Sequence, residues 1–334
     1  MVFELRRVVG GQFHPAVVKF GLQMHRGLLR GSTTRVFGLL HTLSQVLRDY
    51  EAPAGKELIR DFDATVLKPS LEFLHRCRPL SLSMRNTVEV FRQTLFGMEN
   101  TQGDNEVKLK MLEHIADSTE FIRLAREQIK LTAAARIVDE DVVLIYGYCA
   151  LVTSIVKYAK EHLKKEFKVI VVDTGPDFEG KLSLEELCCA GIQACYTYIT
   201  ALNVVMSKVN KVILGADAIL ANGAVKGPIG ASQVAMVANS RNVPVLVCCE
   251  TFKFTETVQT DSFHFNELGP ESELLNLTEN LNLNPGSTSA QIKTLNLKYD
   301  VMPGDFVSAL VTEIGMLPCS SVPVVTREHF LRRA

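Results

Sequence analysis

The stretch KVILGADAILANGAVKGPIGASQVAMVANSRNVPVLVCCETFKF, from Lys211 to Phe254, decides the fold of this chain. Its pattern predicts a buried strand, a glycine-rich loop, a helix and a second buried strand. Gly223, Gly227 and Gly230 would let the loop backbone approach a ligand, and the free N–H groups of the following helix could hold a phosphate. The stretch therefore predicts half of a nucleotide or sugar-phosphate pocket.

The same alternation of strands and helices begins near Asp141 and continues toward the C-terminus. Continuous apolar strands separated by helices are typical of a mostly parallel sheet that helices cover on both faces. We therefore expect an α/β fold in which residues 138–334 form a Rossmann-like domain. A polar segment, Phe263–Thr294, predicts a long surface loop. Further strands are expected at Val142–Tyr146, Val169–Asp173, Ala194–Ile199, Val243–Cys249, Tyr299–Val301 and Ser321–Val325.

Residues 1–137 have the apolar spacing of helices, and we expect them to form a separate helical domain. The clearest helix is predicted from Ser32 to Tyr50, where apolar residues recur on one face and Ser32 is a suitable N-cap. A third helical stretch from about Lys56 to Arg76 contains Pro69, which predicts a kink or a break. One or two further helices are expected between Asn105 and Ile137.

Composition excludes several classes of protein. The 334 residues carry a formal net charge of -1, whereas nucleic-acid binders normally show a basic domain or stripe. No apolar run approaches the roughly 20 residues of a membrane span, and no secretory signal is visible. The eight cysteines form no CxxC pair, which favours core thiols in a reducing cytosol over disulfides or a metal site. We expect a cytosolic protein without metal or cofactor.

Ligands of open parallel sheets bind at the C-terminal ends of the strands. The candidate site residues are therefore those that follow the predicted strands. They are Tyr148 and Cys149 after the first strand, Gly175 after the second, and Asp217, Asn222, Gly223 and Pro228 after the strand that begins at Lys211.

These residues together resemble the family that unites methylthioribose-1-phosphate isomerase, ribose-1,5-bisphosphate isomerase and the regulatory subunits of translation initiation factor 2B. The resemblance rests on the GAD…ANG loop, Gly215–Gly223, and on the later IG before a helix that contains glutamine. Longer blocks such as RPLSLSMRN (Arg78–Asn86), VQTDSFHFNEL (Val258–Leu268) and EIGMLPCSSVPVV (Glu313–Val325) are similar to the delta-type regulatory subunits.

The resemblance implies a non-catalytic regulatory subunit of the guanine nucleotide exchange factor for initiation factor 2. Such a subunit helps to bind factor 2 and to sense phosphorylation of its alpha subunit, whereas the exchange chemistry belongs to other subunits. The implied partners are the alpha, beta, gamma and epsilon subunits of factor 2B and the alpha subunit of factor 2. Direct contact with nucleic acid or membrane is not implied. Delta-type subunits commonly carry a long charged N-terminal extension before the region that resembles this sequence.

The resemblance also indicates that the isomerase pocket is degenerate. The isomerases use a cysteine and an aspartate to move a proton, and basic groups to hold the sugar phosphate. Asp217 matches the aspartate, but Tyr148 occupies the place of the cysteine and Cys149 lies one residue late. Pro228 and Gly175 stand where basic residues are expected, and proline offers neither an N–H nor a charge. The chain is therefore expected not to be an enzyme, although Asp217 leaves a sugar-phosphate isomerase as the alternative.

A basic cluster lies in or beside the first predicted helices. It consists of His25, Arg26, Arg30 and Arg35. Such a cluster could bind an acidic or phosphorylated partner through charge-assisted hydrogen bonds. The alternative is that these side chains form an ordinary solvated face.

Overall fold

A computed structural model describes residues 13–53, 57–98, 103–275 and 294–331. The chain divides into two units, one that extends to Ala125 and takes in the residues from Arg327 onward, and one formed by Arg126–Thr326. The long helix α7 (Asp104–Ala134) contributes residues to both units. The division into domains at residues 137 and 138 stays a prediction.

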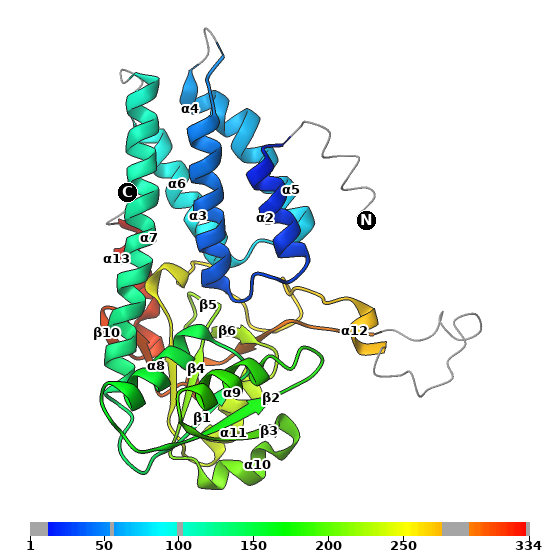
Figure 1. The fold of residues 1–334 in the computed structure, drawn as a ribbon, viewed down its shortest axis with the longest axis vertical. Helices are drawn as coiled ribbons and strands as arrows, with labels where there is room; N and C mark the ends of the chain where they lie inside the picture. Colours follow the sequence, from blue (N-terminus) through cyan, green and yellow to red (C-terminus); the bar gives the residue numbers. More distant parts are fainter. Residues whose placement is uncertain (1–12, 54–56, 99–102, 276–293, 332–334) are drawn as a thin grey trace, which may run out of the picture. The chain divides into compact units, whose positions relative to one another are not determined.

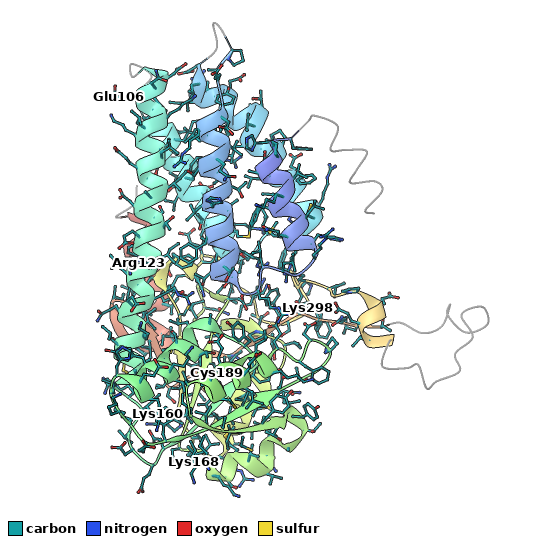
Figure 2. The ribbon with its side chains drawn as sticks, in the orientation of Figure 1. Glu106, Arg123, Lys160, Lys168, Cys189 and Lys298 are labelled. Atoms are coloured by element: carbon teal, nitrogen blue, oxygen red, sulfur yellow. The ribbon has the colours of Figure 1, made fainter. Side chains whose placement is uncertain are left out.

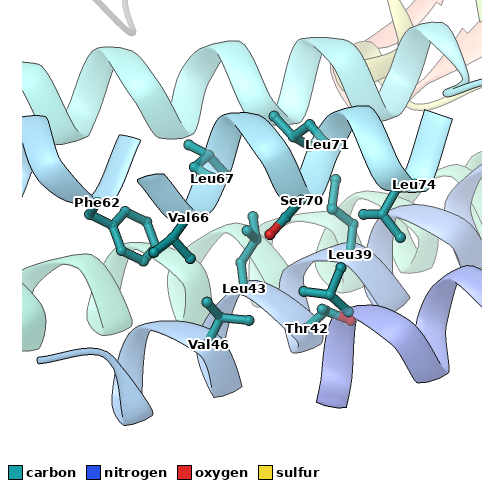
Figure 3. Close-up of a pocket in the computed structure, with 11 residues that line it drawn as sticks. Leu39, Thr42, Leu43, Val46, Phe62, Val66, Leu67, Ser70, Leu71 and Leu74 are labelled. Carbon is teal, nitrogen blue, oxygen red and sulfur yellow. The ribbon is translucent and has the colours of Figure 1, made fainter. Parts of the chain in front are cut away.

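The first unit is helical, as its apolar spacing predicted. Its helices are α2 (Pro15–His25), α3 (Ser32–Asp49), α4 (Leu58–Asp61), the π-helix η1 (Phe62–Leu67), α5 (Lys68–Cys77), α6 (Leu82–Phe96) and the first part of α7. Helix α2 packs against α3 and α5, and α3 packs against α6. Figure 3 shows side chains of α3, η1 and α5, among them Leu43, Val66 and Ser70, around a cavity of about 10 Å³. A cavity of this size holds at most one water molecule, so it belongs to the packed core.

Of two local predictions for these helices, the N-cap at Ser32 is wrong and the irregularity at Pro69 is confirmed. Ser32 is not the N-cap of α3, because it is the first helical residue and Gly31 caps the helix with φ 74°. Glycine adopts this left-handed conformation at little cost, so the helix begins after it. Pro69 does mark an irregularity, because the π-helix η1 ends directly before α5, in which Pro69 lies in the first turn. Proline has no N–H for the α-helical ladder.

The second unit contains a seven-stranded sheet, and the predicted fold class is confirmed (Figure 1). Strand β1 (Val142–Tyr146) has the bounds that were predicted. All neighbouring strands are parallel except β9 and β10. The strand order is β10 (Gly315–Leu317), β9 (Ala309–Thr312), β7 (Val245–Cys248), β4 (Lys211–Gly215), β1, β2 (Lys168–Asp173) and β3 (Gln193–Tyr198).

Helices cover both faces of this sheet. Alternate residues of β1 belong to different apolar clusters, because side chains of a strand point to opposite faces. Val143 and Ile145 pack with residues of α8 (Ala150–Glu161), α9 (Gly180–Cys189) and the end of α7. Leu144 and Tyr146 pack with residues of α10 (Leu202–Val205) and α11 (Ala231–Ser240).

Short 3-10 turns occur at Ile199–Ala201 (η2), Met206–Lys208 (η3), Thr251–Lys253 (η4), Gly304–Phe306 (η6) and Cys319–Ser321 (η7).

The last part of the chain differs from the prediction. Tyr299–Met302 (β8) is a strand, but it joins β5 (Ala218–Ile219) and β6 (Val225–Pro228) in a separate antiparallel sheet. Ser321–Val325 is not a strand: Val322–Leu331 forms helix α13. A short apolar run does not distinguish a strand from a helix, and proline is tolerated in the first turn. Helix α12 (Glu271–Leu275) interrupts the predicted loop, whose residues 276–293 lie outside the described ranges.

The cysteines are only partly core residues. Cys77, Cys248, Cys249 and Cys319 are buried and Cys149 is half-buried. The prediction of core thiols is wrong for Cys188, Cys189 and Cys195, which are exposed. The first two end helix α9 and the third lies on β3, an edge strand of the sheet (Cys189 is labelled in Figure 2).

A lysine stabilises the C-terminal end of α7. The Lys165 ammonium group donates hydrogen bonds to the carbonyl oxygens of Ala134 and Ala135, both at 3.2 Å, and to that of Ile137. The last carbonyl groups of a helix have no partner within it and carry the negative end of the helix dipole. Lys165 therefore supplies both the missing donors and a compensating charge.

Candidate functional site

A pocket of about 400 Å³ lies beside the N-terminus of α11. Its wall includes Thr174 and Gly175, which follow β2, and Ile199, which follows β3. This is the place where open parallel sheets bind ligands. The lining residues are Thr174, Gly175, Ile199, Ile229, Gly230, Ser232, Gln233, Met236, Ser262, Phe263, Leu297 and Asp300.

The turn into α11 is tightly constrained. Gly230 has φ 93°, and a Cβ atom at this position would collide with the hydroxyl group of Tyr146. That hydroxyl donates a hydrogen bond to the carbonyl oxygen of Ile229. Burial and the carboxylates of Asp173 and Asp300 raise the pKa of Tyr146, so its phenol stays a donor. Glycine is therefore required at position 230 both for its backbone conformation and for the close approach of Tyr146.

The N–H groups that were expected to hold a phosphate have a partner within the chain. Asp300, on β8, accepts hydrogen bonds from the backbone N–H groups of Gly230 and Ser232, both at 3.2 Å through Oδ2. Its other oxygen, Oδ1, accepts a bond of 2.9 Å from the Ser262 hydroxyl. A carboxylate at a helix N-terminus compensates the positive end of the helix dipole. Asp300 thus occupies the anion position that the sequence assigned to a ligand.

The two candidate residues after β1 do not line this pocket. The Tyr148 hydroxyl donates to Glu186 Oε1 on α9 at 3.0 Å, and burial together with that carboxylate raises the pKa of Tyr148 to about 12. Cys149 is the N-cap residue of α8, and its thiol packs so closely on Gly215 that a Cβ atom there would collide with it.

The candidates after β4 lie mostly within the small antiparallel sheet. The Asp217 N–H donates to the carbonyl oxygen of Lys226, and the half-buried Asp217 does not line the pocket. Asn222 donates to the carbonyl oxygen of Gln259 at 2.9 Å and accepts from the N–H of Ala224, as a turn residue does. Exposed Pro228 ends strand β6, opposite Tyr299.

Gly223 has a structural reason to be glycine. Its φ is 78°, and a Cβ atom would lie 2.7 Å from the carbonyl oxygen of Cys319. Of the seven candidates from the sequence, Gly175 is the one that the structure places in the pocket wall. Ser232, Ser262 and Asp300 were not predicted as site residues, because Asp300 reaches the start of α11 through the pairing of β8 with β6 and not through a local sequence pattern.

A second group of polar residues, also missed, is buried at the end of β7. Lys253 and Glu250 are almost fully inaccessible and form an ion pair of 2.8 Å. Lys253 Nζ also donates to the carbonyl oxygen of Ala216 at 3.0 Å, and Arg126 lies 3.9 Å from the other Glu250 oxygen. Burial alone would lower the pKa of Lys253, but the Glu250 carboxylate outweighs it and the pKa is raised. One feature of the sequence could have predicted this ion pair: the oppositely charged Glu250 and Lys253 lie three residues apart, directly after an apolar strand.

The basic cluster is only partly on the surface. Arg35 is 1% exposed, so it is not available to a partner at the surface of its unit. His25 is half-buried and its Nδ1 lies 3.3 Å from the carbonyl oxygen of Cys77. Arg26 and Arg30 are exposed.

Within the described ranges, no group of three or more His, Cys, Asp or Glu side chains is arranged to hold a metal ion. None of the helices in the same ranges combines the length and the hydropathy that crossing a bilayer requires.

Comparison with known proteins gives a consistent result. The chain is 36% identical over 323 residues to the translation initiation factor eIF2B subunit delta of Schizosaccharomyces pombe. The aligned region covers 94% of this chain and 68% of the relative. The subunit delta of Dictyostelium discoideum is 35% identical, over 95% of this chain and 51% of the relative. The chain thus spans about half to two thirds of these relatives. Ribose 1,5-bisphosphate isomerase of Pyrococcus furiosus is 30% identical over 79% of this chain and 80% of the enzyme.

Solved structures and a family model agree with these relatives. The tetrameric eIF2B-beta2-delta2 complex from C. thermophilum contains a chain that matches with a TM-score of 0.82 and 31% identity, over 90% of this chain and 92% of that one. The structure of eIF2B delta from Chaetomium thermophilum matches with a TM-score of 0.75 and 28% identity, over 91% and 98%. The model of the initiation factor 2 subunit family matches residues 28–319. This chain therefore belongs to the initiation factor 2 subunit family.

Proposed function

We propose that this chain is a delta-type regulatory subunit of eIF2B, the guanine nucleotide exchange factor for initiation factor 2. The observation that carries the proposal is the match to a chain of an eIF2B-beta2-delta2 complex over 90% of this chain, at 31% identity. The match to subunits named delta over 94% of the chain supports the same assignment. A cytosolic location follows from this role.

The proposed role is non-catalytic. Tyr148 bonds to Glu186, Cys149 packs on Gly215, and Asp300 bonds to the N–H groups at the start of α11. General acid–base catalysis needs both partners within hydrogen-bond reach of a substrate. These contacts support a pocket that has lost the isomerase reaction while the fold was kept for assembly.

The proposed partners follow from the role. The beta subunit is the direct neighbour, because the matched structure is a beta2-delta2 complex. The alpha, gamma and epsilon subunits complete the proposed assembly. In this proposal the helical unit helps to bind the alpha subunit of initiation factor 2 and to sense its phosphorylation, with exposed Arg26 and Arg30 as the candidate contacts. No direct contact with nucleic acid or a membrane is proposed.

Affinity purification of the tagged chain from its source cell, followed by mass spectrometry, tests the proposal. Recovery of the alpha, beta, gamma and epsilon subunits at equal stoichiometry is expected. Recovery of the chain only as a homo-oligomer, without these subunits, would contradict it.

The alternative function is a sugar-phosphate isomerase. It is favoured by the 30% identity to the isomerase of Pyrococcus furiosus and by the retained Asp217. An assay with ribose 1,5-bisphosphate and methylthioribose-1-phosphate distinguishes the two. The proposed role predicts no turnover above that of the Asp217→Asn variant, whereas turnover that depends on Asp217 would establish the alternative.

A further inference from the structure

The pocket beside α11 has the size of a ligand site. Its volume of about 400 Å³ lies within the range of roughly 300–1,000 Å³ that is usual for small-molecule pockets. Its place after the parallel strands is also that of a ligand site. The composition of its wall, however, differs from that of a phosphate site.

Asp300 is the one charged residue among those that line the pocket, and it is negative. Two lysines, one on β6 and one directly before β8, are bonded to other groups. Lys298 Nζ bonds to the carboxylates of Asp177 at 2.9 Å and Glu273 at 2.8 Å. Lys226 Nζ donates to the carbonyl oxygen of Phe265 at 3.1 Å. Among the described residues of the pocket wall, a phosphate would therefore meet a carboxylate without a compensating cation.

The rest of the wall combines neutral polar groups with apolar surface. Ser232 and Gln233, in the first turn of α11, place a hydroxyl and an amide at the wall. Phe263 is 68% exposed and Met236 is 50% exposed, although both line the pocket. Exposed aromatic and thioether side chains are suited to pack against a flat ring.

Asp300 has the bonding capacity to hold a hydroxyl group. Oδ2 accepts two bonds from backbone N–H groups, but Oδ1 accepts one bond, from Ser262. A carboxylate oxygen accepts two, so Oδ1 keeps one position for a hydroxyl donor. An acidic side chain at the edge of a parallel sheet binds ribose hydroxyls in this way.

We propose that this pocket binds an uncharged ribonucleoside and excludes phosphorylated sugars. The base packs against Phe263 and Met236, and a ribose hydroxyl donates to Asp300 Oδ1. Gln233 supplies a further hydrogen bond. This inference does not rest on the proposed function, because it concerns what the pocket accepts whether or not the chain assembles into eIF2B.

Ligand-observed NMR and calorimetry on the 334-residue chain test the proposal, with adenosine, guanosine, cytidine and uridine as probes. At least one nucleoside should bind with a Kd below about 1 mM, which corresponds to roughly 4 kcal/mol. Its 5′-monophosphate and ribose 5-phosphate should bind at least about tenfold more weakly because of the Asp300 carboxylate.

Variants locate the binding. Gln233→Leu should weaken nucleoside binding by about fivefold or more, whereas Asn239→Leu, on the same helix but outside the pocket wall, should leave it unchanged. Asp300→Asn, which keeps the shape of the side chain, should reduce the discrimination against the monophosphate. The absence of nucleoside binding, equal or tighter binding of the monophosphate, or equal effects of Gln233→Leu and Asn239→Leu would each overturn the proposal.

Discussion

Replacement of Lys253 by methionine should destabilise the second unit, because it leaves the Glu250 carboxylate buried without its ion-pair partner. The two groups are 2.8 Å apart, and unit charges at that distance attract by roughly 6 kcal/mol at an effective dielectric constant of about 20. The variant also removes the cost of burying the ammonium group, which is several kcal/mol, and Arg126 remains 3.9 Å from Glu250. We therefore expect a net loss of about 3 kcal/mol in the free energy of unfolding.

The loss should depend on pH in a defined direction. In the wild-type protein burial raises the pKa of Glu250, but Lys253 outweighs it and the folded-state pKa is lowered, so this stabilisation is present at neutral pH and is lost in acid. Without Lys253 we expect burial to outweigh the remaining attraction of Arg126 and to raise the folded-state pKa of Glu250 above the unfolded value. Protonation then relieves the buried charge, so the difference between variant and wild type should shrink as the pH falls from about 8 to about 5.

Hydrogen–deuterium exchange detected by mass spectrometry measures the free energy of opening of β4 and β7. It reports on the second unit separately, which global unfolding of a chain with two units does not. Lys157→Met is the matched control, because it breaks a half-exposed ion pair with Glu186 and should cost less than about 1 kcal/mol. The double variant Lys253→Met, Glu250→Gln should recover part of the loss, since the neutral amide needs no counter-charge. A loss below about 1 kcal/mol for Lys253→Met, or a loss independent of pH, would refute the reasoning.

Three further outcomes are expected. Lys165→Met removes the donors at the C-terminal end of α7 and should cost about 1–3 kcal/mol by thermal unfolding, whereas Lys164→Met should cost less than about 0.5 kcal/mol; equal losses would contradict the capping role. Gly223→Ala should lower stability by about 2 kcal/mol through its positive φ and a steric collision, while Gly103→Ala, with open space at the Cβ position, should have little effect. Arg26→Glu should weaken binding to the phosphorylated alpha subunit of initiation factor 2 by about 0.5–2 kcal/mol in calorimetry, and should lower stability by less than about 1 kcal/mol because Arg26 is the C-cap residue of α2; a change only with the unphosphorylated subunit would argue against a phosphate contact.

Elements with a strong local signal could be predicted from the sequence. Val142–Tyr146 is a continuous apolar run rich in β-branched residues, and its bounds agree with β1 because both faces of that strand are buried. Ser321–Val325 looked similar but begins helix α13, since a short apolar run with one proline fits the first turn of a helix as well as a strand. The candidate site was predicted less well. Gly175 lines the pocket, whereas Asn222 and Pro228 belong to a turn and a strand of the small sheet.

The sequence by itself determined the class of fold, the alternation of strands and helices, and the family, because each of these leaves a periodic or contiguous pattern in the chain. Only the tertiary structure decided which groups bond to the N-terminus of α11 and to the buried charges of the Lys211–Phe254 stretch. Asp300 bonds to Gly230 across 70 positions of sequence, and the Lys253 ammonium bonds to the carbonyl oxygen of Ala216. Such bonds form where packing brings distant groups together and excludes water, so no local sequence pattern predicts them.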